Sequence, residues 1–252
     1  FRKMHTVQIG RHTGDDPFID FFDEKKEEIN KCLMIEALSS SLKLCEERYT
    51  KRFAPEHLDK ISFINKAIVD NAEINSIDFF FPEGEHEKDG DVSYTAFSST
   101  DKNHLLSHGI KNINKRSVEA VTLHQLFKDF SLDVVDRLYL DAEGLDAKIL
   151  LSLDPSSVDI PFICFEATHT DGSFTRGDNC QQVYKHLKEN GYKIFTFLHK
   201  GGQEGYNEDQ LDWNWWALKD GDEYLQQEVV EFAGHKSKYD KGNSLWVELN
   251  SQ

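Results

Sequence analysis

The chain has 252 residues and a formal net charge of −16, from 45 acidic and 29 basic side chains. A chain this acidic repels phosphate backbones, which argues against nucleic acid as its main partner. No apolar run approaches the roughly 20 residues that a membrane-spanning helix needs, so no membrane span is predicted. The length fits a single domain over residues 1–252, which we divide into a core over about 5–220 and a C-terminal extension over about 221–252.

The cysteines predict free thiols and a reducing compartment. Cys32, Cys45, Cys164 and Cys180 form no CxxC pair, and Cys32 and Cys164 stand inside apolar, strand-like runs. Free buried thiols suit this pattern better than a disulfide framework or a zinc site does. We therefore expect a cytoplasmic protein, and the sequence leaves its oligomeric state open.

In the first half of the chain, apolar runs alternate with helical patterns, which predicts βαβ units and a mostly parallel sheet. The third strand is expected to break at Asn65. Serines at the start of the second helix are suited to capping it. Strands are predicted at 6–9, 32–35, 61–64 with 67–69, and 77–81, and helices at 16–22 and 39–49.

The second half continues this alternation and ends in an antiparallel pair of strands. Thr122 is placed to cap the helix that follows it, and Gly191 to end a helix as a glycine C-cap. Strands are predicted at 118–123, 138–140, 161–166, 192–198, 213–218 and 245–249, and helices at 102–108, 124–130, 147–153, 181–190 and 224–232.

His104 and His108 stand four apart on the predicted helix over 102–108, which places both on one helix face, as metal ligands require. No Glu occupies the position that it has in HExxH zinc sites, so a pair on the surface is favoured. Alternatively, the segment that carries both histidines lies between strands on the ligand side and, with residues 94–99, forms a lid over a bound substrate.

Trp213, Trp215 and Trp216 make an aromatic cluster near the C-terminal strand pair. Alternation along a strand places Trp213 and Trp215 on one face of the sheet. Covering the sheet is the favoured role, and stacking against a sugar ring is the alternative.

A glycine-bracketed turn follows the first predicted strand. Gly10 and Gly14 let backbone N–H groups approach a ligand closely, although their spacing differs from the dinucleotide pattern Gly-x-Gly-x-x-Gly. Glu36 ends the next strand. In doubly wound folds an acidic residue there accepts hydrogen bonds from ribose hydroxyls, which we favour over a solvated Glu at a strand end.

Residues 138–146 bring two carboxylates to the end of a buried strand. Alternating apolar residues run into Asp141, and Glu143 follows on a Glu-Gly turn before a helical run. Open α/β sheets bind ligands at the carboxyl ends of their strands, so both acids are candidates for a reaction centre. For Glu143 a second interpretation is equally favoured, in which it and Gly144 cap the following helix.

These segments resemble the FkbM family of methyltransferases, a branch of the class I S-adenosylmethionine-dependent enzymes. The Asp-x-Glu-Gly segment at 141–144, preceded by Val-Thr-Leu at 121–123, is the most specific part. The resemblance covers roughly residues 5–200 and implies a Rossmann-like α/β fold, a doubly wound and mostly parallel seven-stranded sheet with helices on both faces. The other matching segments are Val-Gln-Ile-Gly at 7–10, Asp-Asp-Pro at 15–17, Ile-Glu at 35–36, Asn-Lys-Ala-Ile at 65–68 and Phe-Glu at 165–166.

The resemblance implies S-adenosylmethionine as the cofactor, with Glu36 on the ribose and Ala37 and Leu38 beside the adenine. This chain has Gln8, and Arg-His at 11–12, where many members have Asp and Ala-Asn. Gln8 lacks the charge that would pair with the cofactor's ammonium group, so Asp15 or Asp141 is a candidate for that contact. The implied cofactor-binding residues are Gly10, Arg11, His12, Gly14, Asp15, Glu36, Ala37, Asn65, Ala67 and Asp141.

The reaction that the resemblance implies is O-methylation of a hydroxyl on a small molecule or saccharide. In one mechanism Asp141, Glu143 or His169 acts as general base on that hydroxyl. In another, Asp141 and Glu166 hold a divalent cation, Mg²⁺ or Ca²⁺ rather than zinc, that lowers the hydroxyl's pKa. The candidate catalytic residues are Asp141, Glu143, Glu166 and His169.

Two other classes of function stay open at this point. One is an enzyme that uses NAD or a nucleotide sugar on a similar sheet, and the missing Gly-x-Gly-x-x-Gly pattern counts against it. The other is a non-catalytic module that binds S-adenosylmethionine but lacks the base.

Overall fold

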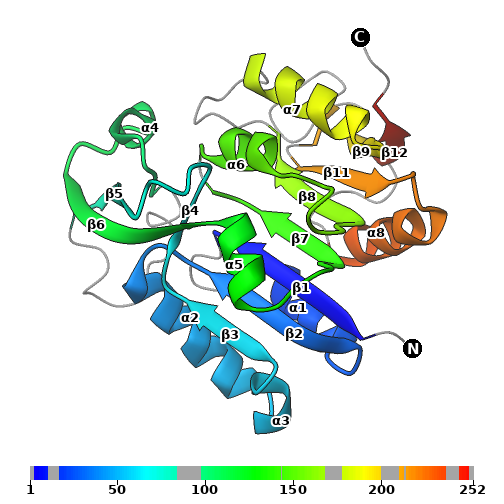
Figure 1. Cartoon of the computed structure of the whole chain (residues 1–252), viewed down its shortest axis with the longest axis horizontal. Helices are drawn as coiled ribbons and strands as arrows, with labels where there is room; N and C mark the ends of the chain where they lie inside the picture. The colour runs from blue at the N-terminus through cyan, green and yellow to red at the C-terminus, as the bar shows by residue number, and fades with distance from the viewer. Residues whose placement is uncertain are drawn as a thin grey trace.

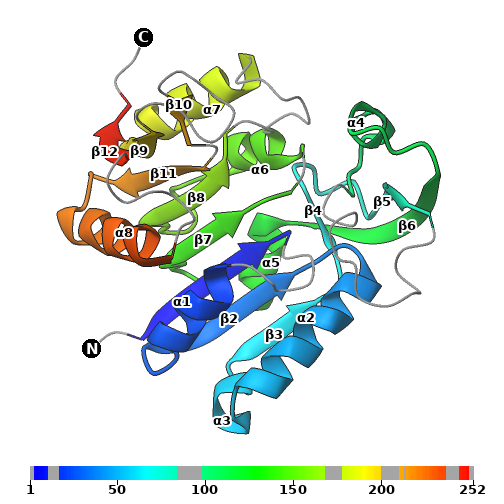
Figure 2. The same cartoon turned by 180° about the vertical axis from the view of Figure 1, so that it is seen from behind.

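The computed structural model describes residues 3–10, 17–83, 98–142, 144–167, 178–199, 210–212, 214–236 and 244–249. Within these ranges the strands form a large sheet and a small sheet beside it (Figure 1). The large sheet is covered by helices, and the small sheet extends from the edge at which its parallel strands end (Figure 2).

The large sheet is mostly parallel. Five strands pair in parallel, from β3 through β2, β1 and β7 to β8, and β11 then runs antiparallel between β8 and β9. Each strand pairs with the next in the order β10 (Gln210–Leu211), β9 (Tyr192–His199), β11 (Asn214–Lys219), β8 (Phe162–Glu166), β7 (Arg137–Leu140), β1 (Met4–Ile9), β2 (Ile29–Ile35) and β3 (Ile61–Ile64), and β12 (Ser244–Glu248) also pairs with β9.

This sheet has nine strands where seven were predicted, and the difference arises around β9. β10 continues the line of β11 along one side of β9, since Asp212 between them donates its N–H to the carbonyl of Phe197 at 2.8 Å. β12 pairs along the other side of β9. It is the edge strand that the sequence predicted at 245–249.

Helices cover both faces of the large sheet (Figures 1 and 2). Apolar residues of the three helices on one face share a buried cluster with β1, β2, β7 and β8. On the other face, two helices pack on β2 and a third on β8, β9 and β11. The first set is α5 (Leu123–Asp129), α6 (Asp146–Ser152) and α7 (Asp178–Glu189), and the second is α1 (Pro17–Lys25), α2 (Ser39–Arg52) and α8 (Glu223–Lys236).

Alternation along β2 shows why its sequence is apolar throughout. Leu33 and Ile35 belong to the cluster under α5, α6 and α7, whereas Cys32 and Met34 belong to the cluster under α1 and α2. All four side chains are 0 or 1% exposed. A parallel strand covered on both faces buries every residue, because successive side chains point to opposite sides.

The small sheet consists of β4 (Ala67–Val69), β6 (Ile113–Thr122) and β5 (Ser76–Pro82), with β6 in the centre. The predicted break at Asn65 is confirmed, but the two pieces of that strand belong to different sheets: β3 pairs with β2, and β4 with β6. β6 begins five residues earlier than predicted, at Ile113 instead of Val118. Two short helices, α3 (Pro55–Leu58) and α4 (Lys102–Ser107), complete the described elements.

One of the two predicted N-caps is confirmed. The Thr122 hydroxyl accepts a hydrogen bond from the N–H of Gln125 at 3.2 Å. The serines of α2 were the wrong choice, because Leu38 occupies its N-cap without a side-chain bond. The N–H of Leu38 instead donates to Oε1 of Glu36 at 2.8 Å.

Trp215 and Trp216 cover the sheet, as predicted, and lie on opposite faces, as alternation along β11 requires. Trp215 is 5% exposed and meets Phe165 edge to face, with ring centroids 6.2 Å apart. Trp216 packs against Phe197 on the other face. Trp213 lies outside the described residues.

The cysteine and membrane predictions are also tested. Cys32, Cys45, Cys164 and Cys180 are free thiols, as expected, and all but Cys164 are buried. Among the described residues, no helix combines the length and apolarity needed to cross a bilayer.

Candidate cofactor site

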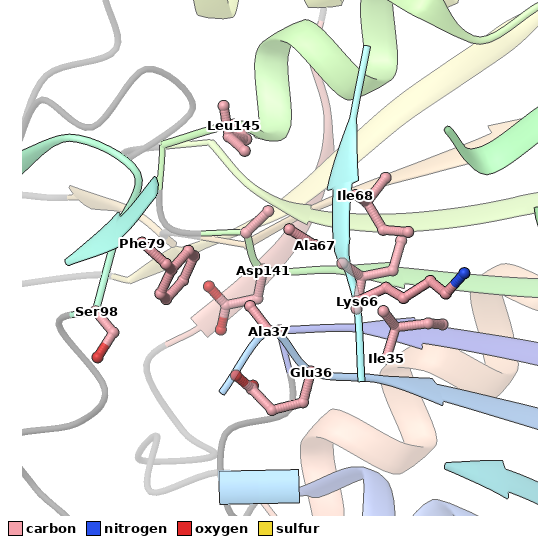
Figure 3. A pocket seen from close by; sticks show the side chains of 13 residues that line it. Ile35, Glu36, Ala37, Lys66, Ala67, Ile68, Phe79, Ser98, Asp141 and Leu145 are labelled. Carbon is pink, nitrogen blue, oxygen red and sulfur yellow. The ribbon is translucent and has the colours of Figure 1, made fainter. Parts of the chain in front are cut away.

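A pocket lies where the carboxyl ends of β1, β2 and β7 meet the small sheet (Figure 3). Each of these strands contributes its last residue or the turn that follows, and β4 and β5 contribute from the small sheet. Ligands of open α/β sheets bind at this edge. The lining residues are Ile9, Gly10, Ile35, Glu36, Ala37, Lys66, Ala67, Ile68, Phe79, Ser98, Asp141, Ala142 and Leu145.

Gly10 is required by the close approach of two strand ends. A Cβ atom there would lie 1.5 Å from the carbonyl oxygen of Asp141, and the φ of Gly10 is +76°. The backbones are joined on both sides: Gly10 donates to Ile35 O at 3.0 Å, and the N–H of Asp141 donates to Ile9 O at 3.2 Å. Only glycine combines this φ with the absence of a side chain.

Glu36 lies in the pocket and is 6% exposed. Its Oε1 accepts the Leu38 N–H, and its own N–H donates to the carbonyl of Ile64 at 3.0 Å. The loop after β2 is therefore held by backbone bonds and by the carboxylate itself. The carboxylate lies at the place where the sequence predicted contact with a ribose.

Asn65 does not line the pocket. Its amide donates to the backbone carbonyls of Glu36 at 2.9 Å and of Ala37 at 2.8 Å. Both bonds cross from the β3–β4 junction to the loop after β2. Asn65 therefore holds that loop in place, and its contact at the adenine edge stays a prediction.

The turn after β7 is held by Asp146, which sequence reasoning missed. This carboxylate is 1% exposed and accepts the N–H of Ala142 at 3.1 and 3.2 Å and that of Gly144 at 3.4 Å. Gly144 has a φ of +102°, which permits the turn. The signal was present in the sequence, because Asp146 directly precedes the helix predicted at 147–153, and carboxylates favour the N-terminus of a helix.

The remaining wall of the pocket is apolar and comes largely from the small sheet. In Figure 3, Phe79 and Ser98 lie on one side, Ala67 and Ile68 on the other, and the carboxylates of Glu36 and Asp141 between them. The sequence predicted the strand that carries Phe79 but gave Phe79 no role, and it offered Ser98 only as part of the possible lid at 94–99. The Lys66 side chain points away from the pocket and pairs with Glu119.

One other predicted site residue that the structure describes, Glu166, is not part of this pocket. Glu166 ends β8 opposite Asn214 of β11. No group of three or more His, Cys, Asp or Glu side chains within the described ranges is arranged to hold a metal ion. The residues that lie outside the described ranges are Arg11, His12, Gly14, Asp15, Glu143 and His169.

The prediction of a surface histidine pair was wrong for His104. This residue is 2% exposed, and its ring centroid lies 4.7 Å from that of His108, in an edge-to-face contact. α4 packs against β5, so the face that carries His104 is turned inward. The pair is part of the packing of this helix.

The fold and the position of the pocket are those of methyltransferase-like α/β proteins, in which a large, mostly parallel sheet carries its ligand at the carboxyl edge. The model of the methyltransferase FkbM domain matches residues 8–194. The chain therefore belongs to the FkbM methyltransferase family, as the motifs at 7–10 and 141–144 indicated. No curated protein matches the chain.

Solved structures resemble the chain at low sequence identity. A methyltransferase FkbM from Methylobacillus flagellatus KT is 12% identical, with a TM-score of 0.49 over 86% of this chain and 44% of that one. A SAM dependent methyltransferase from Aquifex aeolicus is 10% identical, with a TM-score of 0.37 over 86% of this chain and 84% of that one. The chain thus spans less than half of the length of the FkbM structure.

Proposed function

We propose that the protein is an S-adenosylmethionine-dependent methyltransferase that methylates a hydroxyl of a small molecule or saccharide, with residues 1–252 acting as one domain. The observation that carries the proposal is the convergence of Gly10, Glu36, Ala37, Ala67 and Asp141 on one pocket. These residues come from three strand ends and the small sheet. Each was expected at the cofactor site from the sequence alone.

The described residues suit an adenosyl ligand. Glu36 offers carboxylate oxygens to a ribose, since a carboxylate is matched to a pair of adjacent hydroxyls. Ala37 and Ala67 leave room for a flat base, and Gly10 lets a ligand approach the backbone. The loop residues Arg11, His12, Gly14 and Asp15 complete the proposed contacts. When bound, S-adenosylmethionine supplies the methyl group on a sulfonium centre.

The chain's own part in the reaction is to orient the acceptor and to take its proton. Asp141, at the end of β7 in the pocket, is the proposed general base and accepts the proton at a carboxylate oxygen. Glu143 and His169 are the alternatives for this role. A cation held by Asp141 and Glu166 is a separate proposal, in which the hydroxyl loses its proton more easily.

The first test is calorimetric titration of the purified chain with S-adenosylhomocysteine, with NAD as the control ligand. Micromolar binding of S-adenosylhomocysteine and no binding of NAD support the proposal. Binding of NAD alone would contradict it. Repeating the titration with Mg²⁺ tests the cation proposal, which expects tighter binding when the metal is present.

The ribose contact is tested by Glu36→Ala. Loss of hydrogen bonds to a charged group should weaken binding of S-adenosylhomocysteine by about 1–3 kcal/mol. Glu56→Ala is the matched control, because Glu56 is exposed on α3 and does not line the pocket. An unchanged dissociation constant for Glu36→Ala would refute the assignment of this residue to the ribose.

A further inference from the structure

Ser98 presents a buried hydroxyl to the pocket. The residue is 5% exposed, and within the described part of the chain its Oγ has no hydrogen-bond partner. Most buried polar side-chain atoms in proteins are hydrogen-bonded, and one that is not lowers stability until a partner arrives. Since Ser98 lines the pocket, a bound ligand can provide that partner.

The position of Ser98 is fixed by its neighbour. Ser99 exchanges two backbone hydrogen bonds with Phe80 of β5, at 2.8 and 3.0 Å, and its hydroxyl accepts the N–H of Asp101 at 3.2 Å. This bridge attaches the segment to the small sheet. Ser98 therefore holds its place at the pocket without help from a ligand.

The surroundings of Ser98 suit the edge of a flat ring. Phe79 belongs to the same buried apolar cluster as Ala67 and Leu38, and Ala37 packs against that cluster. Figure 3 shows Ser98 beside Phe79, on the side of the pocket opposite Ala67. Glu36 and Asp141 lie between these walls and, when ionised, accept hydrogen bonds only. The Ser98 hydroxyl differs from them because it also donates.

We propose that Ser98 Oγ hydrogen-bonds the edge of the cofactor's purine base, and that Phe79 forms the apolar side of the slot for that base. This inference rests on the proposed function. It makes the small sheet the part of the chain that selects the nucleoside, whereas the large sheet holds the ribose and the reacting end. Hydrogen-bonding edges distinguish one base from another, and apolar walls do not.

The test is Ser98→Ala, titrated with S-adenosylhomocysteine and with 5′-methylthioadenosine, which has the same nucleoside but no amino-acid part. Loss of one hydrogen bond should weaken both ligands by the same factor, about three- to tenfold. Unchanged affinity for both ligands overturns the proposal. A loss confined to S-adenosylhomocysteine also overturns it, because Ser98 would then contact the amino-acid part.

Ser41→Ala is the matched control. Ser41 is 0% exposed, its Oγ likewise has no partner among the described residues, and it lies on α2 outside the pocket lining. This variant should bind both ligands as the parent chain does. Thermal unfolding without ligand should show that neither variant is less stable, because each loses only a hydroxyl without a partner. Weak binding by a destabilised Ser98→Ala protein would instead indicate a structural role.

The outcomes separate this inference from the proposed function. If the parent chain binds neither ligand, both proposals fail. If the parent chain binds S-adenosylhomocysteine and Ser98→Ala binds it equally well, only the assignment of Ser98 fails.

Discussion

The two halves of the large sheet differ in what they do with their strand ends. In the parallel half, β1, β2 and β7 end at one edge, and their last residues and following turns line the pocket. In the other half, β11 runs antiparallel between β8 and β9, and aromatic rings of Phe197, Trp216 and Trp246 pack on one another. Parallel direction gathers strand ends together, whereas antiparallel direction separates them.

Asp141 and Glu166 illustrate the same difference. Both acids end neighbouring parallel strands, and the sequence offered no reason to separate them. Asp141 lies beside Gly10 of β1 and lines the pocket, but Glu166 lies opposite Asn214 of the antiparallel β11. Which of the two carboxylates lines the pocket therefore follows from the strand beside it, and not from the sequence motif that contains it.

The largest expected effect is that of Gly10→Ala, which should disrupt the parallel half of the sheet, whose strand ends line the pocket. Its Cβ cannot fit 1.5 Å from Asp141 O, so β1 and β7 must move apart. We expect the free energy of unfolding to fall by more than about 3 kcal/mol and binding of S-adenosylhomocysteine to be lost. Urea unfolding and calorimetry measure these two effects.

Gly109→Ala is the control for that change. Gly109 has a similar φ of +78°, but no atom of the described residues lies within 4 Å of its added Cβ. Backbone conformation alone should cost about 1 kcal/mol and leave binding unchanged. Equal losses of stability in Gly10→Ala and Gly109→Ala would mean that the close contact between the ends of β1 and β7 does not matter for stability.

Arg137→Met should affect stability without affecting the site. Arg137 is 5% exposed, at the start of β7, and donates to Glu228 of α8 at 2.6 Å. Removing one partner leaves a partly buried charge, so unfolding should become easier by about 2–3 kcal/mol. Lys115→Met, which breaks an exposed pair with Asp78, should cost less than about 1 kcal/mol. Weaker ligand binding by Arg137→Met would contradict the independence of the pocket from the opposite end of β7.

The smallest expected effect is a loss of stability at alkaline pH. Burial raises the pKa of the Cys32 thiol to about 12, from a usual value near 9.0. Above that usual value the unfolded chain loses the proton and the folded chain keeps it, so stability is intact below it and falls as pH rises. By about pH 10 the loss should be about 1 kcal/mol.

Urea unfolding between about pH 8 and about pH 10 measures this slope, with Cys32→Ala as the comparison. Burial also raises the pKa of the Tyr192 phenol, which adds to the same trend in both proteins. An identical pH dependence in the parent chain and in Cys32→Ala would refute the role of the thiol.

The sequence predicted the large sheet well because its strands are apolar and its helices begin at recognisable signals. The sequence also singled out Gly10, Glu36 and Asp141 as candidate site residues, because each directly follows a buried strand, and all three line the pocket. The small sheet was harder to predict, because β4 and β6 pair across about fifty residues. The first part of β6, with Asn114, Lys115 and Arg116, is polar and is defined by its hydrogen bonds with β5.

The same reason explains the site residues that were missed. Phe79 and Ser98 reach the pocket only through the small sheet, so no local pattern assigned them to the cofactor site. Asp146 was missed for a different reason. An acid beside the start of a predicted helix is common, and nothing in the sequence shows that this carboxylate also holds the preceding turn.

Asn65 gives the two sheets a shared joint. The chain leaves the large sheet just before Asn65 and enters the small sheet just after it. The Asn65 side-chain amide hydrogen-bonds the loop that carries Glu36. A tilt of the small sheet at Asn65 would therefore also move the loop that carries Glu36. If the cofactor binds as proposed, a substitution of Asn65 should therefore weaken the contacts at the base and at the ribose together.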